Sequence, residues 1–388
     1  MRSPDAPRVL HVLRGLNRGG VEKWLVDVLR NTPPGAWSTE FLLHTREPGA
    51  YDAEVRALGG VLRYCPGTRR PHDYMRRLNA LLHAHGPYDV VHSHVHLYSG
   101  VVLRAAHQAG VPVRIAHSHT TKAPHGALRR LYGRLMRSSI RTHATHCLAA
   151  SEQAARTLFG PDWQNDARIS VHECGLDFSV FAKLPQRELL KQQLGVPAGR
   201  VVVGQVGRFA PMKNHQFLVR AFAELIRHGV DAHLVLVGTG ALEAEVRAQV
   251  EALSLTDRCM FAGGHNDVTR FYGALDLLVV PSLYEGLALV ALEAQAAGVP
   301  VLASEAVPAA AQVIPGLLHR HRLDEGAATW ARLAQRIIAT ARPLERPASA
   351  RALSESRYGV ARSVRELGRI YGVAPSRAGG YPLPELVS

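Results

Sequence analysis

Cysteine is scarce in this sequence, and the few cysteines are scattered. Among its 388 residues there are four, Cys65, Cys147, Cys174 and Cys259, and no two of them form a C-x-x-C pair. A disulfide framework or a thiolate zinc site needs cysteines at closer, recurring spacings. We therefore expect free thiols in a reducing, cytoplasmic environment.

Long hydrophobic runs are also absent. No segment approaches the roughly 18 consecutive apolar residues that a membrane-spanning helix needs. The N-terminus, MRSPDAPRVLHVLRG, has too short an apolar stretch for a signal peptide. The sequence predicts a protein that is soluble or attached peripherally to the inner face of the plasma membrane.

One long window contains no acidic residue. Between Val90 and Ser151 there is no Asp or Glu, although the whole chain has 32 acidic and 46 basic residues. This basic window favours an anionic partner, such as the phosphates of a small molecule or an anionic membrane surface; a solvated helix face is the alternative. It lacks interleaved aromatic residues, so we expect no nucleic acid. The basic residues of the window are Arg104, Arg114, Lys122, Arg129, Arg130, Arg134, Arg137 and Arg141.

Short apolar runs alternate with amphipathic stretches along the chain. Runs such as RVLHVL and YDVVHSH are separated by helical periodicity at 72–85, 98–109 and 126–141, and the pattern restarts at RVVVGQVGR. This order predicts an α/β protein with parallel sheets and helices on both faces. The length suits two domains of about 150–200 residues.

We expect two doubly wound, Rossmann-like domains. The first covers 1–185, and the second covers 186–375, with the last helix able to cross back to the first domain. The tail at 376–388, rich in Gly and Pro, is predicted to be disordered.

Histidines gather where two strands of the first domain are expected to end. His92, His94 and His96 alternate in DVVHSHVH, and His117 and His119 follow in IAHSH. Ligands bind beyond the carboxyl ends of strands in open parallel sheets, so these side chains are candidate site residues. We expect no metal there, because His96 lies beyond the strand and no acidic side chain that could orient the ligands is nearby in the sequence. Strand-end histidines that only bond loop carbonyls stay an alternative.

The second domain places cations directly after a strand. The stretch VGRFAPMKNH presents Gly207, Arg208 and Lys213 before a helix. A glycine lets an anion approach the backbone, a guanidinium can bind two oxygens, and an ammonium adds a point charge. The stretch predicts a cradle for a diphosphate, with ordinary surface cations as the alternative; Gly238 in LVGTG is a weaker signal of the same kind.

Two glutamates follow a later strand. In PSLYEGLALVALEAQAAGVPV, Glu285 lies in the loop, and Glu293 lies about two turns into the next helix. A carboxylate can accept hydrogen bonds from two vicinal hydroxyls, which makes a sugar a natural ligand. The helix is apolar nearly all round, so we expect Glu293 to be buried and to have a partner.

Taken together, these motifs resemble the retaining glycosyltransferases of the GT-B fold, family 4 (glycosyl transferases group 1), especially those of exopolysaccharide and capsule clusters. The resemblance covers about residues 8–370 and rests on GGVEK, VGRFAPMKNH, LVGTG, PSLYEG and the Glu-x7-Glu spacing. It implies two Rossmann-like domains facing across a cleft. It also implies transfer of a sugar from a nucleotide diphosphate sugar, of which a UDP-sugar is the commoner, to a saccharide or lipid-linked saccharide in cell-surface polysaccharide synthesis.

The resemblance also implies roles for residues. Arg208 and Lys213 would hold the donor diphosphate, Glu293 the ribose hydroxyls and Glu285 the transferred sugar. His117 would meet that sugar from the first domain, although the HSH register leaves His119 open. Other donor-site residues implied are Gly19, Gly20, Gly207, Gly238, Gly286 and Leu287. The acceptor side would include His92, His94, Arg129 and Arg130. Cys174 departs from the family pattern, which commonly has Asn before this Gly.

The chain contains no Asp-x-Asp motif. A leaving diphosphate needs a metal ion or fixed cations to stabilise its charge, so Arg208 and Lys213 are expected to replace a metal ion. We therefore expect no metal and no cofactor besides the nucleotide sugar. Retention by front-side substitution follows from the resemblance alone.

Two other classes compete with this interpretation. A GT-B sugar-nucleotide epimerase would need acid/base carboxylates in the first domain, where the acid-free window has none. A non-catalytic nucleotide-sugar-binding protein would keep Glu293 and Arg208 but lose Lys213 or the histidines, and here all are present. The sequence leaves open the sugar, base, acceptor, linkage and oligomeric state.

Overall fold

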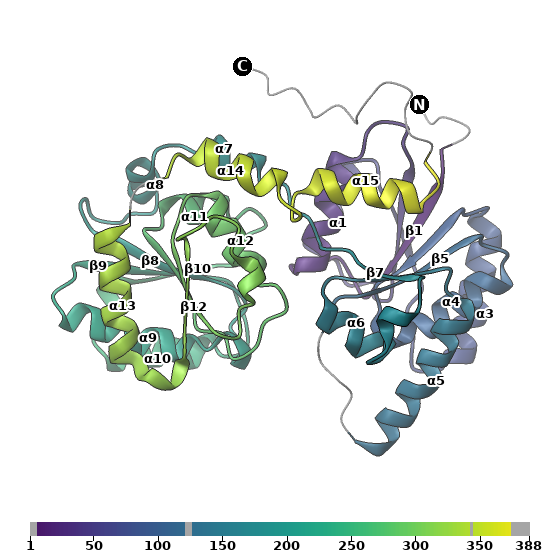
Figure 1. Cartoon of the computed structure of the whole chain (residues 1–388), viewed down its shortest axis with the longest axis horizontal. Coiled ribbons are helices and arrows are strands. Elements are labelled where there is room, and N and C mark those ends of the chain that lie inside the picture. The colour runs from purple at the N-terminus through teal and green to yellow at the C-terminus, as the bar shows by residue number, and fades with distance from the viewer. Residues whose placement is uncertain (1–5, 121–125, 342–343, 374–388) are drawn as a thin grey trace. The chain divides into compact units, whose positions relative to one another are not determined.

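The computed structural model describes residues 6–120, 126–341 and 344–373 (Figure 1). The expected disordered tail at 376–388 and Lys122 of the basic window lie outside these residues. No helix in the described ranges has the length and apolar character of a membrane span. All four cysteines are free thiols, as expected.

The chain forms two compact units. The first consists of the described residues of Met1–Leu176 and Arg357–Ser388, and the second is Asp177–Ser356. The boundary thus lies at Leu176, before the expected position of 185, and the last helix belongs to the first unit. This helix packs on the first helix of that unit through a hydrogen bond from Trp24 Nε1 to Ser363 Oγ, 3.2 Å long.

The first unit is built on a seven-stranded parallel sheet in the order β3-β2-β1-β4-β5-β6-β7. The order reverses between β1 and β4, which creates a switch point at the carboxyl edge where ligands bind in such sheets. Its strands are β1 (Arg8–Leu13), β2 (Ser38–Leu43), β3 (Val61–Tyr64), β4 (Val90–Ser93), β5 (Val113–Ser118), β6 (His146–Ala149) and β7 (Ile169–Val171). Its helices are α1 (Gly20–Asn31), α2 (Asp52–Ala57), α3 (Pro71–His85), α4 (Ser99–Gln108), α5 (Ala127–His143), α6 (Glu152–Phe159) and α15 (Val360–Ile370).

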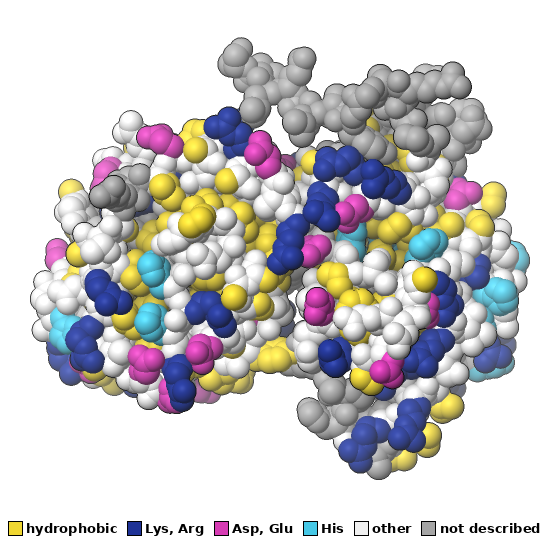
Figure 2. All heavy atoms as spheres, in the orientation of Figure 1, with side chains coloured by type: hydrophobic (Ala, Val, Ile, Leu, Met, Phe, Trp, Pro, Cys, Tyr) yellow, Lys and Arg dark blue, Asp and Glu magenta, His cyan; other side chains and the backbone are white. Residues whose placement is uncertain are grey.

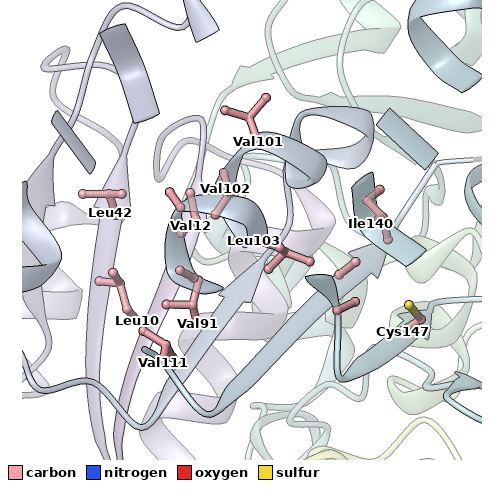
Figure 3. Packing of buried hydrophobic residues seen from close by; sticks show 14 of the residues in the cluster. Leu10, Val12, Leu42, Val91, Val101, Val102, Leu103, Val111, Ile140 and Cys147 are labelled. Atoms are coloured by element: carbon pink, nitrogen blue, oxygen red, sulfur yellow. The ribbon is translucent and has the colours of Figure 1, made fainter. Parts of the chain in front are cut away.

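Alternation along the strands sorts the side chains of the first sheet. Leu10 and Val12 of β1 and Val91 of β4 belong to one buried cluster, which Figure 3 shows with Val102 and Leu103 of α4. Successive side chains on a strand point to opposite faces. His11, which is paired in register with His92, therefore points to the other face of the sheet.

The second unit repeats the plan with six parallel strands in the order β10-β9-β8-β11-β12-β13. The expectation of two doubly wound α/β units is confirmed. The strands are β8 (Val201–Val206), β9 (Ala232–Val237), β10 (Cys259–Gly263), β11 (Leu277–Val280), β12 (Val301–Ser304) and β13 (Leu318–His321). The helices are α7 (Ser179–Ala182), α8 (Arg187–Gln193), α9 (His215–Arg227), α10 (Glu243–Ala252), α11 (Thr269–Ala274), α12 (Leu289–Ala296), α13 (Gly326–Thr340) and α14 (Arg346–Glu355).

Candidate functional site

The loop between β8 and α9 lies tightly against the end of β9. Gly207 N donates to Val237 O over 2.8 Å, and Phe209 N donates to Thr239 O over 3.1 Å. At Gly238, where φ is +143°, a Cβ would lie 2.0 Å from Gly207 O, so only glycine fits. The LVGTG motif is thus required for the close approach of two loops.

Lys213 and Glu285 form an ion pair in the second unit. Lys213 Nζ lies 2.6 Å from Glu285 Oε1, with the two side chains 18% and 10% exposed. Ser282 Oγ donates to the same carboxylate oxygen over 2.7 Å. The stem of Lys213 lies against Gly207, where a Cβ would be 3.4 Å from Lys213 Cε. The two side chains are therefore in contact, although the family resemblance implies that Lys213 holds the diphosphate and Glu285 the transferred sugar.

Arg208 stands apart from this pair. Its side chain is exposed, and it makes no ion pair or hydrogen bond with the described residues. A guanidinium without a protein partner keeps its donors available for an anion. Gly286 is exposed and Leu287 half-buried in the loop that leads to α12.

Further contacts tie the loop after β8 to the loop after β11. Asn214, in the left-handed region at φ +53°, donates from Nδ2 to Pro281 O over 3.1 Å. Gln205 Nε2 donates to Lys213 O over 2.7 Å. The sequence analysis missed Gln205 and Ser282, although Ser282 precedes Glu285 by only three residues. These bonds hold the carboxyl ends of two adjacent strands as one surface.

Glu293 is buried on α12 and has a partner, as expected. It is 9% exposed and accepts a hydrogen bond from the Tyr272 hydroxyl of α11 over 2.8 Å. Burial and the neighbouring Glu293 charge raise the pKa of Tyr272 well above its usual value, so the phenol stays a donor. The carboxylate is therefore held in place by a neutral donor.

Removal of the Tyr272 hydroxyl should destabilise the second unit. In Tyr272→Phe the buried Glu293 carboxylate loses a donor, and we expect the free energy of unfolding in urea to fall by about 1–3 kcal/mol. The control is Tyr284→Phe, which removes a hydroxyl from a 37% exposed side chain. That change should stay within about 0.5 kcal/mol. Equal stability of the two variants would show that the bond to Glu293 contributes nothing.

Histidines of the first unit meet at the carboxyl edge of its sheet. His94 contacts two of them: its Nε2 lies 3.0 Å from His11 Nδ1, and its Nδ1 lies 2.9 Å from His119 Nε2. His92 Nε2 lies 3.1 Å from His117 Nδ1. The expected gathering of strand-end histidines is therefore found, with His11 as an added member.

His96 does not join this cluster. Its backbone adopts a left-handed conformation at φ +50°, and it begins a separate 3-10 turn, His96–Tyr98. The alternating pattern of His92, His94 and His96 breaks there because the strand has already ended at Ser93.

Several partners of the cluster come from distant parts of the sequence. The Tyr371 hydroxyl lies 2.8 Å from His92 Nδ1, and Cys174 Sγ lies 3.6 Å from His119 Nδ1. His172 Nδ1 lies 3.0 Å from a Glu366 carboxylate oxygen. The sequence analysis missed these contacts. Only His11 could have been found from the sequence, because it is a polar residue inside an apolar strand.

Burial keeps these imidazoles neutral. Desolvation lowers the pKa of His11 and of His119 to about 3. It also lowers the pKa values of His92, His94 and His117 well below the usual range. For His117, an interaction with the His172 backbone raises the pKa and so offsets a part of this lowering. A neutral imidazole has one donor and one acceptor, so each nitrogen–nitrogen contact is an N–H···N bond.

Exposure distinguishes the two candidate histidines of β5 and its loop. His117 is 0% exposed, whereas His119 is partly exposed. A sugar can touch only a side chain that it can reach, so the structure favours His119 over His117 for this contact. His92 is also 0% exposed, between His117 and Tyr371.

The remaining candidates lie elsewhere in the first unit. Gly19 caps α1, and a Cβ there would come within 2.3 Å of Glu22 Oε2, while Gly20 is the first residue of the helix. Arg130 is exposed on α5, and the side chain of Arg129 lies outside the described residues. No contact among the described residues brings Arg130 to the histidine cluster.

Two protein families match this chain. The glycosyl transferase 4-like domain matches residues 6–175, and the glycosyl transferases group 1 domain matches residues 186–339. A putative glycosyltransferase of Bacillus subtilis (strain 168), EpsF, is 34% identical over 375 residues, which cover 95% of this chain and 97% of that protein. The chain belongs to the glycosyltransferase group 1 family.

Other similarities support the family and the fold. An Escherichia coli UDP-Gal:alpha-D-GlcNAc-diphosphoundecaprenol alpha-1,3-galactosyltransferase is 29% identical over 224 residues, covering 56% of this chain and 58% of that protein. The crystal structure of Anabaena HepE in complex with UDP matches with a TM-score of 0.77 at 20% identity, over 95% of this chain and 100% of that one. The glycosyltransferase therefore has the GT-B fold that its motifs predicted.

Proposed function

We propose that this glycosyltransferase retains anomeric configuration and transfers a sugar from a UDP-sugar to a saccharide or lipid-linked saccharide in cell-surface polysaccharide synthesis. The observation that carries the proposal is the Lys213–Glu285 pair beside Gly207, with Arg208 exposed in the same loop. HepE, which shares the fold, is described with UDP and with UDP-glucose. The name of the Escherichia coli relative gives a UDP-sugar donor and a diphosphoundecaprenol acceptor.

The charge of the leaving diphosphate would be stabilised by side chains. Cleavage of the bond between the sugar C1 and the phosphate oxygen places negative charge on UDP, and Arg208 and Lys213 supply fixed positive charge for it. The acceptor oxygen bonds to C1 on the same face, and its proton passes to the leaving phosphate oxygen. This step uses no metal ion and no cofactor besides the donor.

The carboxylates would recognise hydroxyls. When a diphosphate attracts Lys213, Glu285 can accept hydrogen bonds from the sugar, and Ser282 keeps it in position. Glu293, fixed by Tyr272, would accept from the ribose hydroxyls. In the second unit Gly207, Gly238 and Gly286, with Leu287 after Gly286, would let the donor approach the protein backbone, and Gly19 and Gly20 would do the same in the first unit.

The proposal is tested by transfer from labelled UDP-sugars in the presence of EDTA. Wild-type protein should stay active, and Arg208→Ala and Lys213→Ala should each lower turnover on the order of 100-fold, with a smaller effect on UDP affinity. Arg227→Ala, an exposed arginine on α9, is the control and should be unchanged. Loss of activity in EDTA that magnesium or manganese restores would contradict the role of these cations.

The histidines should affect transfer more than nucleotide binding. We propose that His119 contacts the donor sugar, with His117 and His92 behind it and His94 and Arg130 toward the acceptor. His119→Ala should lower turnover by about 10–100-fold while UDP affinity, set by the second unit, is kept. His83→Ala, an exposed histidine on α3, is the control. Full activity of both His117→Ala and His119→Ala would leave the cluster a purely structural role.

The exposed face of α5 would bind an anionic membrane, where a lipid-linked acceptor resides. Leu128, Leu131 and Leu135 are 85%, 56% and 59% exposed at helical spacing. Arg130 and Arg134 are exposed between them, and Figure 2 shows basic and apolar side chains side by side over this helix. Apolar side chains next to arginines suit an interfacial helix. We propose that the enzyme works in the cytoplasm, at the inner face of the plasma membrane.

Vesicle sedimentation tests this surface. We expect wild-type protein to sediment with vesicles that contain phosphatidylglycerol and not with phosphatidylcholine alone. The double variant Leu131→Ser, Leu135→Ser should lose most of this binding because it removes the inserted apolar area. Leu253→Ser, which changes a leucine that is 40% exposed in the second unit, should bind as wild type. Binding that is the same for all three proteins would contradict the assignment to α5.

A further inference from the structure

We propose that His94, His117 and His119 form a binding site for a divalent transition-metal ion of the zinc type. One ring nitrogen of each residue lies within 4.8 Å of the other two. Zinc–nitrogen bonds of about 2.0–2.1 Å in a tetrahedral site place ligating nitrogens about 3.3 Å apart. His94 Nδ1 and His119 Nε2, at 2.9 Å, are close to that separation. Small ring movements would convert this hydrogen bond into a pair of ligands.

The third ligand atom is available as well. His117 Nδ1 faces His92, which leaves Nε2 as the nitrogen for an ion. This atom is fully buried and forms no well-aligned hydrogen bond with the described residues, although the His172 backbone interacts weakly with the ring. A buried nitrogen without a bond costs free energy, and a metal ion would remove that cost.

The outer nitrogen of each ligand is held by a neighbour. His94 Nε2 faces His11 Nδ1 at 3.0 Å, and His117 Nδ1 faces His92 Nε2 at 3.1 Å. The outer nitrogen of His119 faces Cys174 Sγ at 3.6 Å. Metal-ligating histidines usually bond through the second nitrogen to a fixed partner, which orients the ring. The cluster therefore has both the ligating nitrogens of a metal site and the outer partners that orient the rings.

The sequence analysis expected no metal here because His96 lies beyond the strand and no acidic supporting residue is nearby in the chain. In the structure the outer partners are neutral groups from distant segments, His11, His92 and Cys174, and Tyr371 in turn bonds His92. Three neutral imidazoles leave a fourth position open to water or to an oxygen of a ligand, as in other three-histidine sites. The ion would be held by residues of the first unit alone, and the proposed leaving-group step uses Arg208 and Lys213 of the second unit instead.

A bound ion should oppose transfer, a consequence that rests on the proposed function. Zinc would occupy His119 Nε2, and His119 is the side chain that we assign to the donor sugar. Added zinc should therefore inhibit transfer and leave UDP affinity unchanged, because the nucleotide residues lie in the second unit. EDTA should restore the activity.

The test uses tag-free, full-length protein that has been stripped with a chelator and desalted. Zn²⁺ is titrated by calorimetry, and Co²⁺ by the visible absorption of tetrahedral cobalt. We expect a single equivalent to bind. His94→Gln and His119→Gln should weaken binding by more than about 100-fold, and His92→Gln, which loses an outer partner, by about 10-fold. His83→Ala should bind as wild type.

The outcomes separate this inference from the proposed function. Absence of binding to the wild-type protein, or equal binding by the ligand variants and His83→Ala, overturns the metal site whether or not a variant folds poorly. Loss of transfer in His119→Ala without any metal binding overturns only the metal site. Metal binding without inhibition supports the metal site and removes His119 from the donor sugar. Circular dichroism of each variant establishes that it is folded.

Discussion

The ion pair between Lys213 and Glu285 is the contact on which the second unit's site depends. It joins the loops after β8 and β11, and Ser282 adds a hydrogen bond to the same carboxylate. Both side chains are largely buried, so each charge needs the other while no anion is bound. In the function proposed above, an arriving diphosphate would compete with Glu285 for the ammonium.

The polar cluster of the first unit is neutral, in contrast to the charged pair of the second unit. The window without acidic residues contains His92, His94, His117 and His119, so no carboxylate of that window can hold a positive charge among them. Burial keeps the rings neutral, and neutral rings bond to one another in N–H···N chains that end at Tyr371 and Cys174. The second unit thus carries the charged Lys213–Glu285 pair, and the first unit carries a cluster of neutral imidazoles.

The return of the chain to the first unit completes the histidine cluster. The segment from Arg357 brings Ser363 to Trp24, Glu366 to His172 and Tyr371 to His92. Helix α15 is therefore part of the surroundings of the site, in addition to its packing on α1. This segment therefore supplies groups that contact His172 and His92.

The sequence alone determined the two α/β units, the strand-end position of the histidines and the burial of Glu293. Those features follow from local periodicity and from the rule that parallel sheets bind ligands at their carboxyl edges. Sequence could not find the Lys213–Glu285 pair, which spans 72 residues, or the contact of Tyr371 with His92, which spans 279. Only the tertiary structure decided these partners and the greater exposure of His119, because long-range contacts depend on how sheets and helices pack and leave no periodic trace in the chain.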